Sequence, residues 1–233
     1  METMYKTKTN HSISTAKATR LFWLGRYAER VYITLHQIRK HHDLMIDEDE
    51  KAYISFCNKM GIENKYESSE DFMHKYLFDT ANPDSVISML ELVNDNAILL
   101  REEITSETLS YIQISISYMK NIEDKGKTIN ELQIVTDYML AFWGSMEERV
   151  FSSQIRHTIK FGKYLESLEL HLRFNYPFNR IEQIYRRMLE SVDKEYYICD
   201  EITLLQLEGQ ITFDNYKEYK TLALLNHLFS PKN

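Results

Sequence analysis

The sequence has few residues that interrupt regular structure. Its 233 residues include only six glycines and three prolines. All-β sandwiches and barrels need many tight turns, so this composition argues against them and favours long helices. A hydrophobic content of 43% lets a chain of this length bury a large core. We therefore predict an all-α fold of about eight to ten helices, forming a single compact domain over residues 1–233.

The sequence also lacks an excess of positive charge, a cysteine pattern typical of disulfides or zinc sites, and long apolar runs. The formal charge of −7 argues against general nucleic-acid affinity, which rests on clustered lysine and arginine. Cys57 and Cys199 lack the spacing of a zinc site or a disulfide framework. No apolar run reaches the roughly 18 residues of a membrane span, and the polar stretch METMYKTKTNHS at the amino terminus does not resemble a signal peptide. We expect a soluble, cytoplasmic protein.

Motifs for nucleotides, nucleophiles and metals are missing as well. The chain contains neither GxxxxGK[ST] nor GxGxxG, and it has no GxSxG elbow. Di-iron sites in helical bundles need two Glu-x-x-His pairs, and the nearest spacing here is Asp71-x-x-His74. A lone pair of this kind is more often surface polarity than a metal site. We assign no catalytic residue, no cofactor and no metal site.

Apolar residues recur at helical spacing along most of the chain. A helix is expected from Ser14 or Thr15 to about Met45. Within it, apolar residues follow each other three or four positions apart, at Leu21, Leu24, Ala28, Val31, Leu35 and Ile38. At Asn82 and Pro83, a favoured cap and a favoured first residue predict the start of a helix that runs to residue 104.

A further helical stretch is expected over residues 129–174. Gly144 lies in its interior, where glycine weakens a helix, so we predict a bend or break near this residue. Tyr176 and Pro177 mark its end. No Pro-rich linker or charge block divides the chain, in agreement with one domain.

The stretch LFWLGRYAERV, residues 21–31, places a glycine and a glutamate on an otherwise apolar line. Phe22, Gly25, Glu29 and Ile33 share a face about 130° from the main apolar stripe. Apolar residues on two sides indicate a central helix with neighbours on both. The missing side chain of Gly25 lets another helix come close, and Glu29, one turn further on, is expected to be buried.

A second stretch, FGKYLESLEL at residues 161–170, repeats this pattern. Its corresponding line consists of Ile159, Gly162, Glu166 and Leu170. Lys163 takes the place of Arg26. We therefore predict an internal pseudo-repeat in which two central helices pack about an approximate two-fold axis, with Gly25 and Gly162 at close helix crossings.

Two buried carboxylates need basic or hydrogen-bonding partners, because an unpaired buried charge is costly. The local candidates for Glu29 and Glu166 are Arg26, Arg30 and Lys163. The favoured interpretation is a structural ion-pair network that fixes how the helices register. The alternative is a ligand, phosphate or catalytic site, in which an arginine holds a carboxylate or phosphate and a glutamate accepts a proton.

These residues carry a family resemblance. LFWLGRYAERV, together with LFDTANPDSV and NAILLREEITSE downstream, resembles the bacterial alpha-E family, an all-helical domain named for a Glu-Arg motif. Glu29 and Arg30 match that pair, whereas the second copy keeps Glu166 and has Ser167 in place of the arginine. The resemblance is strongest over residues 14–175, leaving residues 176–233 as carboxyl-terminal helices.

The central part of the family pattern is also recognisable. The matching residues are Asp79, Asn82, Pro83, Ser85, Asn96, Arg101, Ile104, Ser106 and Glu107. Ile98 stands where an arginine is usual, and Trp143-Gly144 with Glu148-Arg149 resembles the segment before the second copy. Asn96 and Arg101 therefore join the candidates for ligand binding or ion pairing.

The resemblance implies partners but no reaction. Alpha-E proteins typically occur beside circularly permuted ATP-grasp proteins and transglutaminase-like proteases, which suggests peptide or amide-bond metabolism. The leading interpretation is thus an accessory, non-catalytic partner of an ATP-grasp ligase. One alternative is an enzyme or small-ligand binder using the Glu/Arg cluster, and another is a structural helical homo-oligomer. An open, wet cleft at Glu29 would favour the enzyme, and a dry, paired network would favour the others.

Overall fold

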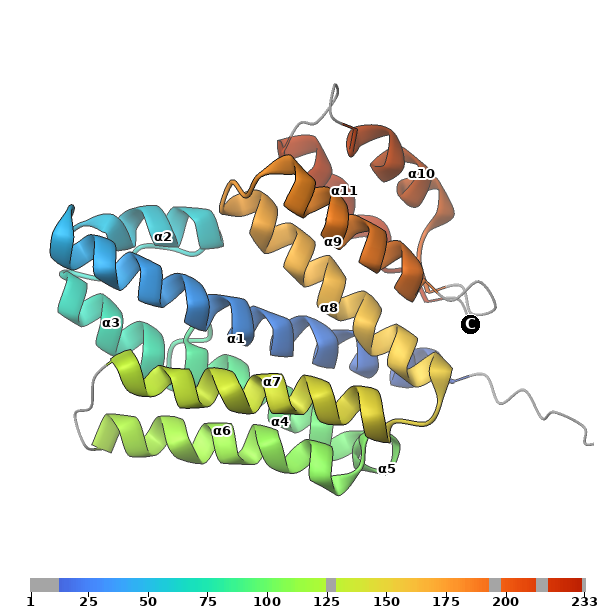
Figure 1. Ribbon diagram of the computed structural model, residues 1–233, viewed down its shortest axis with the longest axis horizontal. Helices are drawn as coiled ribbons and strands as arrows, with labels where there is room; N and C mark the ends of the chain where they lie inside the picture. Colours follow the sequence, from blue (N-terminus) through green and yellow to red (C-terminus); the bar gives the residue numbers. More distant parts are fainter. Residues whose placement is uncertain (1–12, 125–128, 193–197, 213–217, 232–233) are drawn as a thin grey trace, which may run out of the picture.

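The computed structural model describes residues 13–124, 129–192, 198–212 and 218–231, and the polar amino-terminal stretch discussed above lies outside them. The described residues form α-helices and one short 3₁₀ helix, so the all-α prediction is confirmed (Figure 1). Eleven α-helices are present among them, slightly more than expected. They are α1 (Thr15–Asp47), α2 (Ala52–Met60), α3 (Ser69–Phe78), α4 (Val86–Leu99), α5 (Arg101–Ile104), α6 (Ser106–Asp124), η1 (Ile129–Glu131), α7 (Leu132–Arg149), α8 (Ser153–Arg173), α9 (Phe178–Ser191), α10 (Glu201–Gln210) and α11 (Glu218–Leu228).

Helix α1 is central, as its two apolar lines predict. It begins where the side chain of Ser14 accepts a hydrogen bond from the backbone N–H of Lys17 at 3.3 Å. The whole main stripe is buried, and Phe22, Gly25, Glu29 and Ile33 on the second line are buried too. A helix buried on two faces needs neighbours on both, and α1 has them.

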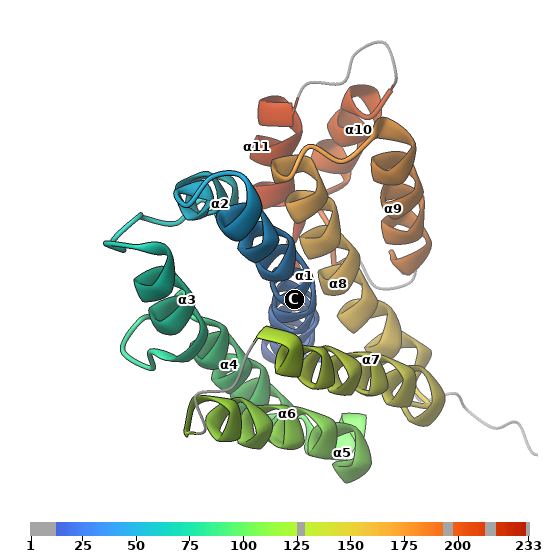
Figure 2. The same ribbon diagram turned by 60° about the vertical axis from the view of Figure 1, so that its left-hand side comes forward.

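Helix α8 crosses α1, and two groups of helices lie on either side of this pair (Figures 1 and 2). On one side, α2 to α7 enclose a core that includes Leu24 and Leu35 of α1. On the other side, α9 and α11 pack on α8 and α10 packs on α11, and together they enclose a second core, which takes Phe22 from α1. The ring of Phe22 stacks on that of Phe229 with centroids 3.7 Å apart. The α1–α8 pair therefore joins the two cores.

The start of α4 differs from the prediction. Asn82 is not the cap and Pro83 is not the first helical residue; instead the side chain of Ser85 accepts from the N–H of Ser88 at 3.2 Å. The amide of Asn82 is buried and donates to the Tyr66 hydroxyl at 3.1 Å. Its Oδ1 atom, which a cap would use, accepts from Nζ of Lys65 at 2.7 Å and from the N–H of Asp84 at 3.1 Å, so Asn82 holds the preceding loop.

The end of α4 also differs. The predicted helix to residue 104 ends at Leu99, and the short helix α5 starts at Arg101. Leu100 leaves the helical conformation, with φ −105° and ψ 9°, and its N–H is shared between the carbonyls of Asn96 and Ala97. A tightened last turn of this kind is a common way to end a helix.

The predicted break near Gly144 is wrong. Helix α7 continues through Gly144, and the chain bends only between α7 and α8. There the side chain of Ser152 caps α8 by accepting from the N–H of Ile155 at 3.4 Å, and Arg156 donates to the Phe151 carbonyl at 3.0 Å. A Cβ on Gly144 would meet nothing within 4 Å, so glycine is tolerated there without being required.

Candidate functional site

Gly25 and Gly162 lie where α1 and α8 touch. A Cβ on Gly25 would lie against the carbonyl oxygen of Ile159, closer than van der Waals contact permits, and a Cβ on Gly162 would meet the carbonyl oxygen of Phe22 in the same way. The obstructing atoms belong to backbone, which cannot turn aside. Only glycine allows the two helices to approach this closely.

These contacts are reciprocal. Gly25 meets the carbonyl of Ile159, which lies three residues before Gly162. Gly162 meets the carbonyl of Phe22, which lies three residues before Gly25. An approximate two-fold axis between α1 and α8 produces this exchange. The same axis relates Glu29 to Glu166, and the two glutamates can be compared as equivalent positions.

Glu166 is fully paired by arginines of α1. The Nε atom of Arg26 donates to Oε2 of Glu166 at 2.5 Å, and Nε of Arg30 donates to Oε1 at 2.6 Å. Glu166 is 1% exposed, so this carboxylate is held in a dry environment. Burial would lower the pKa of Arg26, but the carboxylates of Glu166 and Glu169 outweigh it and raise that pKa. Charge-assisted bonds of this kind are among the strongest in proteins.

Glu169, which we did not predict as a site residue, extends the network. It accepts from Arg26 as well, and its other oxygen lies 3.0 Å from Nη2 of Arg173. Burial would raise the pKa of Glu169, yet Arg26 and Arg173 outweigh it and lower that pKa. The sequence signals available for it were its position one turn after Glu166 and the basic residue four positions later.

Glu29 occupies the equivalent position but lacks equivalent partners. It is 5% exposed, and its Oε2 atom has no hydrogen-bond partner among the described residues. Lys163 and Ser167 face it, at the positions that correspond to Arg26 and Arg30. Burial raises the pKa of Glu29 to about 7, and the charge of Lys163 and the Ser167 hydroxyl offset this only in part. Ser167, at the position that corresponds to Arg30, carries no charge, so the buried carboxyl group of Glu29 is incompletely compensated.

Lys163 lies against aromatic rings of α7 and α8. Its Nζ atom is 4.0 Å from the ring centroid of Trp143 and 5.8 Å from that of Tyr164. Burial lowers the pKa of Lys163, although Glu29 opposes this effect. The ammonium is thus held partly by a cation–π contact, which gives Trp143 a role in this half of the pseudo-repeat.

Asn96 and Arg101 lie away from the two glutamates. The side chain of Asn96 donates to the Leu92 carbonyl at 2.9 Å on α4, and Arg101 is exposed at the start of α5. Among the described residues, neither side chain forms a hydrogen bond or ion pair with Glu29 or Glu166. The structure thus brings together Arg26, Glu29, Arg30, Lys163 and Glu166 and leaves these two candidates out.

Asn96 instead lines a groove between α1 and α4. This α1–α4 groove has a volume of about 570 Å³ and is lined by Thr15, Ala16, Thr19, Arg20, Trp23, Tyr27, Leu92 and Asn96. The rings of Trp23 and Tyr27 stack with centroids 5.1 Å apart, and the guanidinium of Arg26 lies 5.4 Å from the Trp23 ring. One motif therefore supplies both the buried network and the groove wall.

In the part of the chain that the structure describes, no group of three or more His, Cys, Asp or Glu side chains is arranged to hold a metal ion. Asp71, the nearest candidate from the sequence, lies 2.7 Å from Lys75 in an ion pair. No helix within the described ranges has the length and apolar character needed to cross a membrane.

Comparison with known proteins identifies a family for this chain. A family model described as a predicted alpha-helical domain with a conserved ER motif matches residues 15–215. The match extends past residue 175 into the carboxyl-terminal helices. No curated protein and no solved structure matches the chain.

Proposed function

Because the chain belongs to the alpha-E family, we propose that it is an accessory, non-catalytic helical subunit that works with an ATP-grasp-type ligase in peptide or amide-bond formation. The ligase part rests on the partners that the family resemblance implies. The non-catalytic part rests on the geometry around the Glu-Arg motif, whose arginine, like Arg26 one turn before it, donates to Glu166 of the same protein.

The saturation of Glu166 is the observation that carries this proposal. Both of its oxygens accept arginine donors, and the side chains of Arg26 and Arg30 are only 11% and 19% exposed. An arginine that binds a substrate needs free donors aimed at the ligand, but these two aim at a protein carboxylate. The motif therefore serves best as a clasp between α1 and α8.

The surface next to the clasp suits a protein partner. Trp23 is 36% exposed, Leu92 37% and Leu99 63%. Leu92, Asn96 and Leu99 recur at helical spacing, so they share the face of α4 that borders the α1–α4 groove. Exposed aromatic and aliphatic side chains beside a groove are typical of interaction sites. We place the ligase contact here.

The test is capture of the ligase in the native host. Tagged protein should co-purify with an ATP-grasp protein identified by mass spectrometry, and Leu99→Glu should abolish the capture. Leu140→Glu on α7 is the matched control, since Leu140 is also exposed, at 47%, and lies on another helix. Failure of the unmodified bait to capture such a ligase, or equal capture by both variants, would contradict the proposal.

Complementation separates this role from a catalytic one. Glu29→Gln keeps the shape of the side chain and removes its charge and proton. An accessory subunit with this change should still support the host pathway. A folded Glu29→Gln protein that fails to complement would instead favour an enzyme with Glu29 as its proton acceptor.

A further inference from the structure

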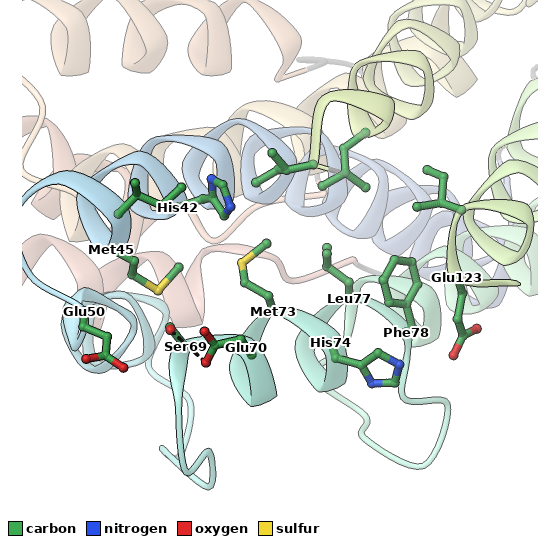
Figure 3. A pocket seen from close by; sticks show the side chains of 14 residues that line it. His42, Met45, Glu50, Ser69, Glu70, Met73, His74, Leu77, Phe78 and Glu123 are labelled. Atoms are coloured by element: carbon green, nitrogen blue, oxygen red, sulfur yellow. Dashed lines mark hydrogen bonds between the residues drawn. The ribbon is translucent and has the colours of Figure 1, made fainter. Parts of the chain in front are cut away.

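A cavity at the other end of α1 has the features of a small-molecule site. It has a volume of about 620 Å³ and lies between the carboxyl-terminal half of α1, α3, the end of α6 and the start of α7. Figure 3 shows His42 and Met45 of α1 pointing toward Met73 of α3. Cavities of this size commonly hold small ligands.

The floor of this cavity is apolar. Met45, Leu77, Ile122 and Leu132 line it, and each is between 1% and 8% exposed. Met73 adds a flexible thioether that is partly buried, and such side chains adapt to ligands of different shapes. An occupant therefore needs an aliphatic or aromatic body.

The mouth of the cavity is acidic. Glu50, Glu70 and Glu123 line it and are exposed, with Glu50 and Glu70 on one side of the view in Figure 3 and Glu123 on the other, and no lysine or arginine is among its described lining residues. Glu70 stays ionised, because its own backbone N–H and the hydroxyls of Ser68 and Ser69 lower its pKa. A ligand with a positive head group would be attracted to this mouth, and a carboxylate would be repelled.

His42 of α1 lies in the wall of the cavity. Its Nδ1 atom is buried without a hydrogen-bond partner among the described residues. The atom lies 3.7 Å from an Asp43 carboxylate oxygen, too far for a hydrogen bond. Because this nitrogen is covered by protein atoms, a ligand in the cavity would meet the carboxylates of the mouth and not the His42 Nδ1 atom.

From this arrangement we propose that the cavity binds a small amphipathic amine, with its apolar body on the floor formed by Met45, Leu77, Ile122 and Leu132 and its protonated amine beside the carboxylates of the mouth. Apolar burial supplies most of the affinity, and the mouth selects the charge. This site is built from the carboxyl-terminal half of α1, whereas the α1–α4 groove uses the amino-terminal half. The proposal therefore does not depend on the ligase contact.

Three probes of equal chain length test the charge preference. Binding of n-octylamine, n-octanol and n-octanoate to the full chain at pH 7 is measured by calorimetry and by thermal shift. Octylamine should bind tightest and octanoate weakest, and the preference of amine over alcohol should shrink as salt rises. No binding of any probe up to its solubility, or octanol or octanoate binding as tightly as octylamine, would overturn the proposal.

Variants locate the site. The triple change Glu50→Gln, Glu70→Gln and Glu123→Gln should weaken octylamine binding by about fivefold or more and leave octanol unchanged. The matched control changes three exposed glutamates elsewhere: Glu102→Gln, Glu148→Gln and Glu190→Gln. Met73→Trp should fill the cavity and abolish binding of all probes, with circular dichroism to verify folding. Equal loss in both triple variants, or full octylamine binding by folded Met73→Trp, would show that the amine binds elsewhere.

Discussion

Replacing Glu29 with glutamine should remove a pH-dependent penalty from the folded state. Burial raises the pKa of Glu29 to about 7, against an ordinary value of 4.5. The gap between these two pKa values corresponds to about 3 kcal/mol of folding free energy. Glutamine has nearly the same shape and no charge, so it avoids this cost.

The direction of the effect follows from proton binding. As pH rises from 4.5 to about 7, the unfolded chain has released the Glu29 proton while the folded protein keeps it. Each step upward in pH therefore favours the unfolded chain, and the full penalty is present above pH 7. Glu29→Gln should exceed the stability of the unmodified protein by about 1 kcal/mol or less at pH 5 and by about 3 kcal/mol at pH 8.

Urea unfolding of both proteins at pH 5, 6, 7 and 8 measures this difference, in which other titrating groups cancel. Glu166→Gln is the control, because it leaves Arg30 without its carboxylate and Arg26 with Glu169 alone, and it should cost about 3–5 kcal/mol at every pH. A difference between Glu29→Gln and the unmodified protein that stays constant from pH 5 to 8 would refute the reasoning about Glu29.

The remaining predictions concern the crossing, the missing arginine and metal content. Gly25→Ala should lower stability by about 1–3 kcal/mol or more, because its Cβ meets backbone. Gly144→Ala, the control, should be neutral or stabilising by up to about 1 kcal/mol. Equal melting temperatures for the two variants would contradict the close approach of α1 and α8 at Gly25. Ser167→Arg should lower the pKa of Glu29 by supplying the counterpart of Arg30, so urea unfolding should show a flatter pH dependence from pH 5 to 8, and an unchanged slope would argue against the two-fold relation. Protein purified without a histidine tag should contain no stoichiometric transition metal by elemental analysis, and one ion per chain would overturn this expectation.

Much of the central architecture could be predicted because it follows from local spacing. Apolar residues three and four positions apart identified α1, and the line through Gly25 and Glu29 indicated a second buried face. The repeat of this pattern at Gly162 and Glu166 then identified α8 as the helix that crosses α1. Glycine and buried glutamate are informative on a helix, since each is unfavourable unless a neighbour makes use of it.

Features set by distant contacts were not predictable. Asn82 is expected to cap α4, but its side-chain oxygen accepts from Lys65 and from the N–H of Asp84 in the preceding loop. The break expected at Gly144 lies instead at Ser152, where capping decides the position. The spacing within α8 points to the pair of Glu169 with Arg173, but the contact of Glu169 with Arg26 of α1 depends on the crossing of the two helices.

The partner assignment of Glu29 was also beyond the sequence. Three basic residues were available locally, and choosing among them requires the crossing geometry of α1 and α8. In the structure both arginines turn to Glu166, and Glu29 faces Lys163 and Ser167. The two-fold relation explains this division, because each glutamate is served by residues of the opposite helix.

The central claim, that the Glu-Arg motif clasps α1 to α8, is tested most directly by a double-mutant cycle between Arg30 and Glu166. Urea unfolding of the unmodified protein, Arg30→Met, Glu166→Gln and the double variant isolates their interaction energy. The 2.6 Å contact between two buried charged groups predicts a coupling of about 1–3 kcal/mol. A coupling within about 0.5 kcal/mol of zero would contradict the clasp.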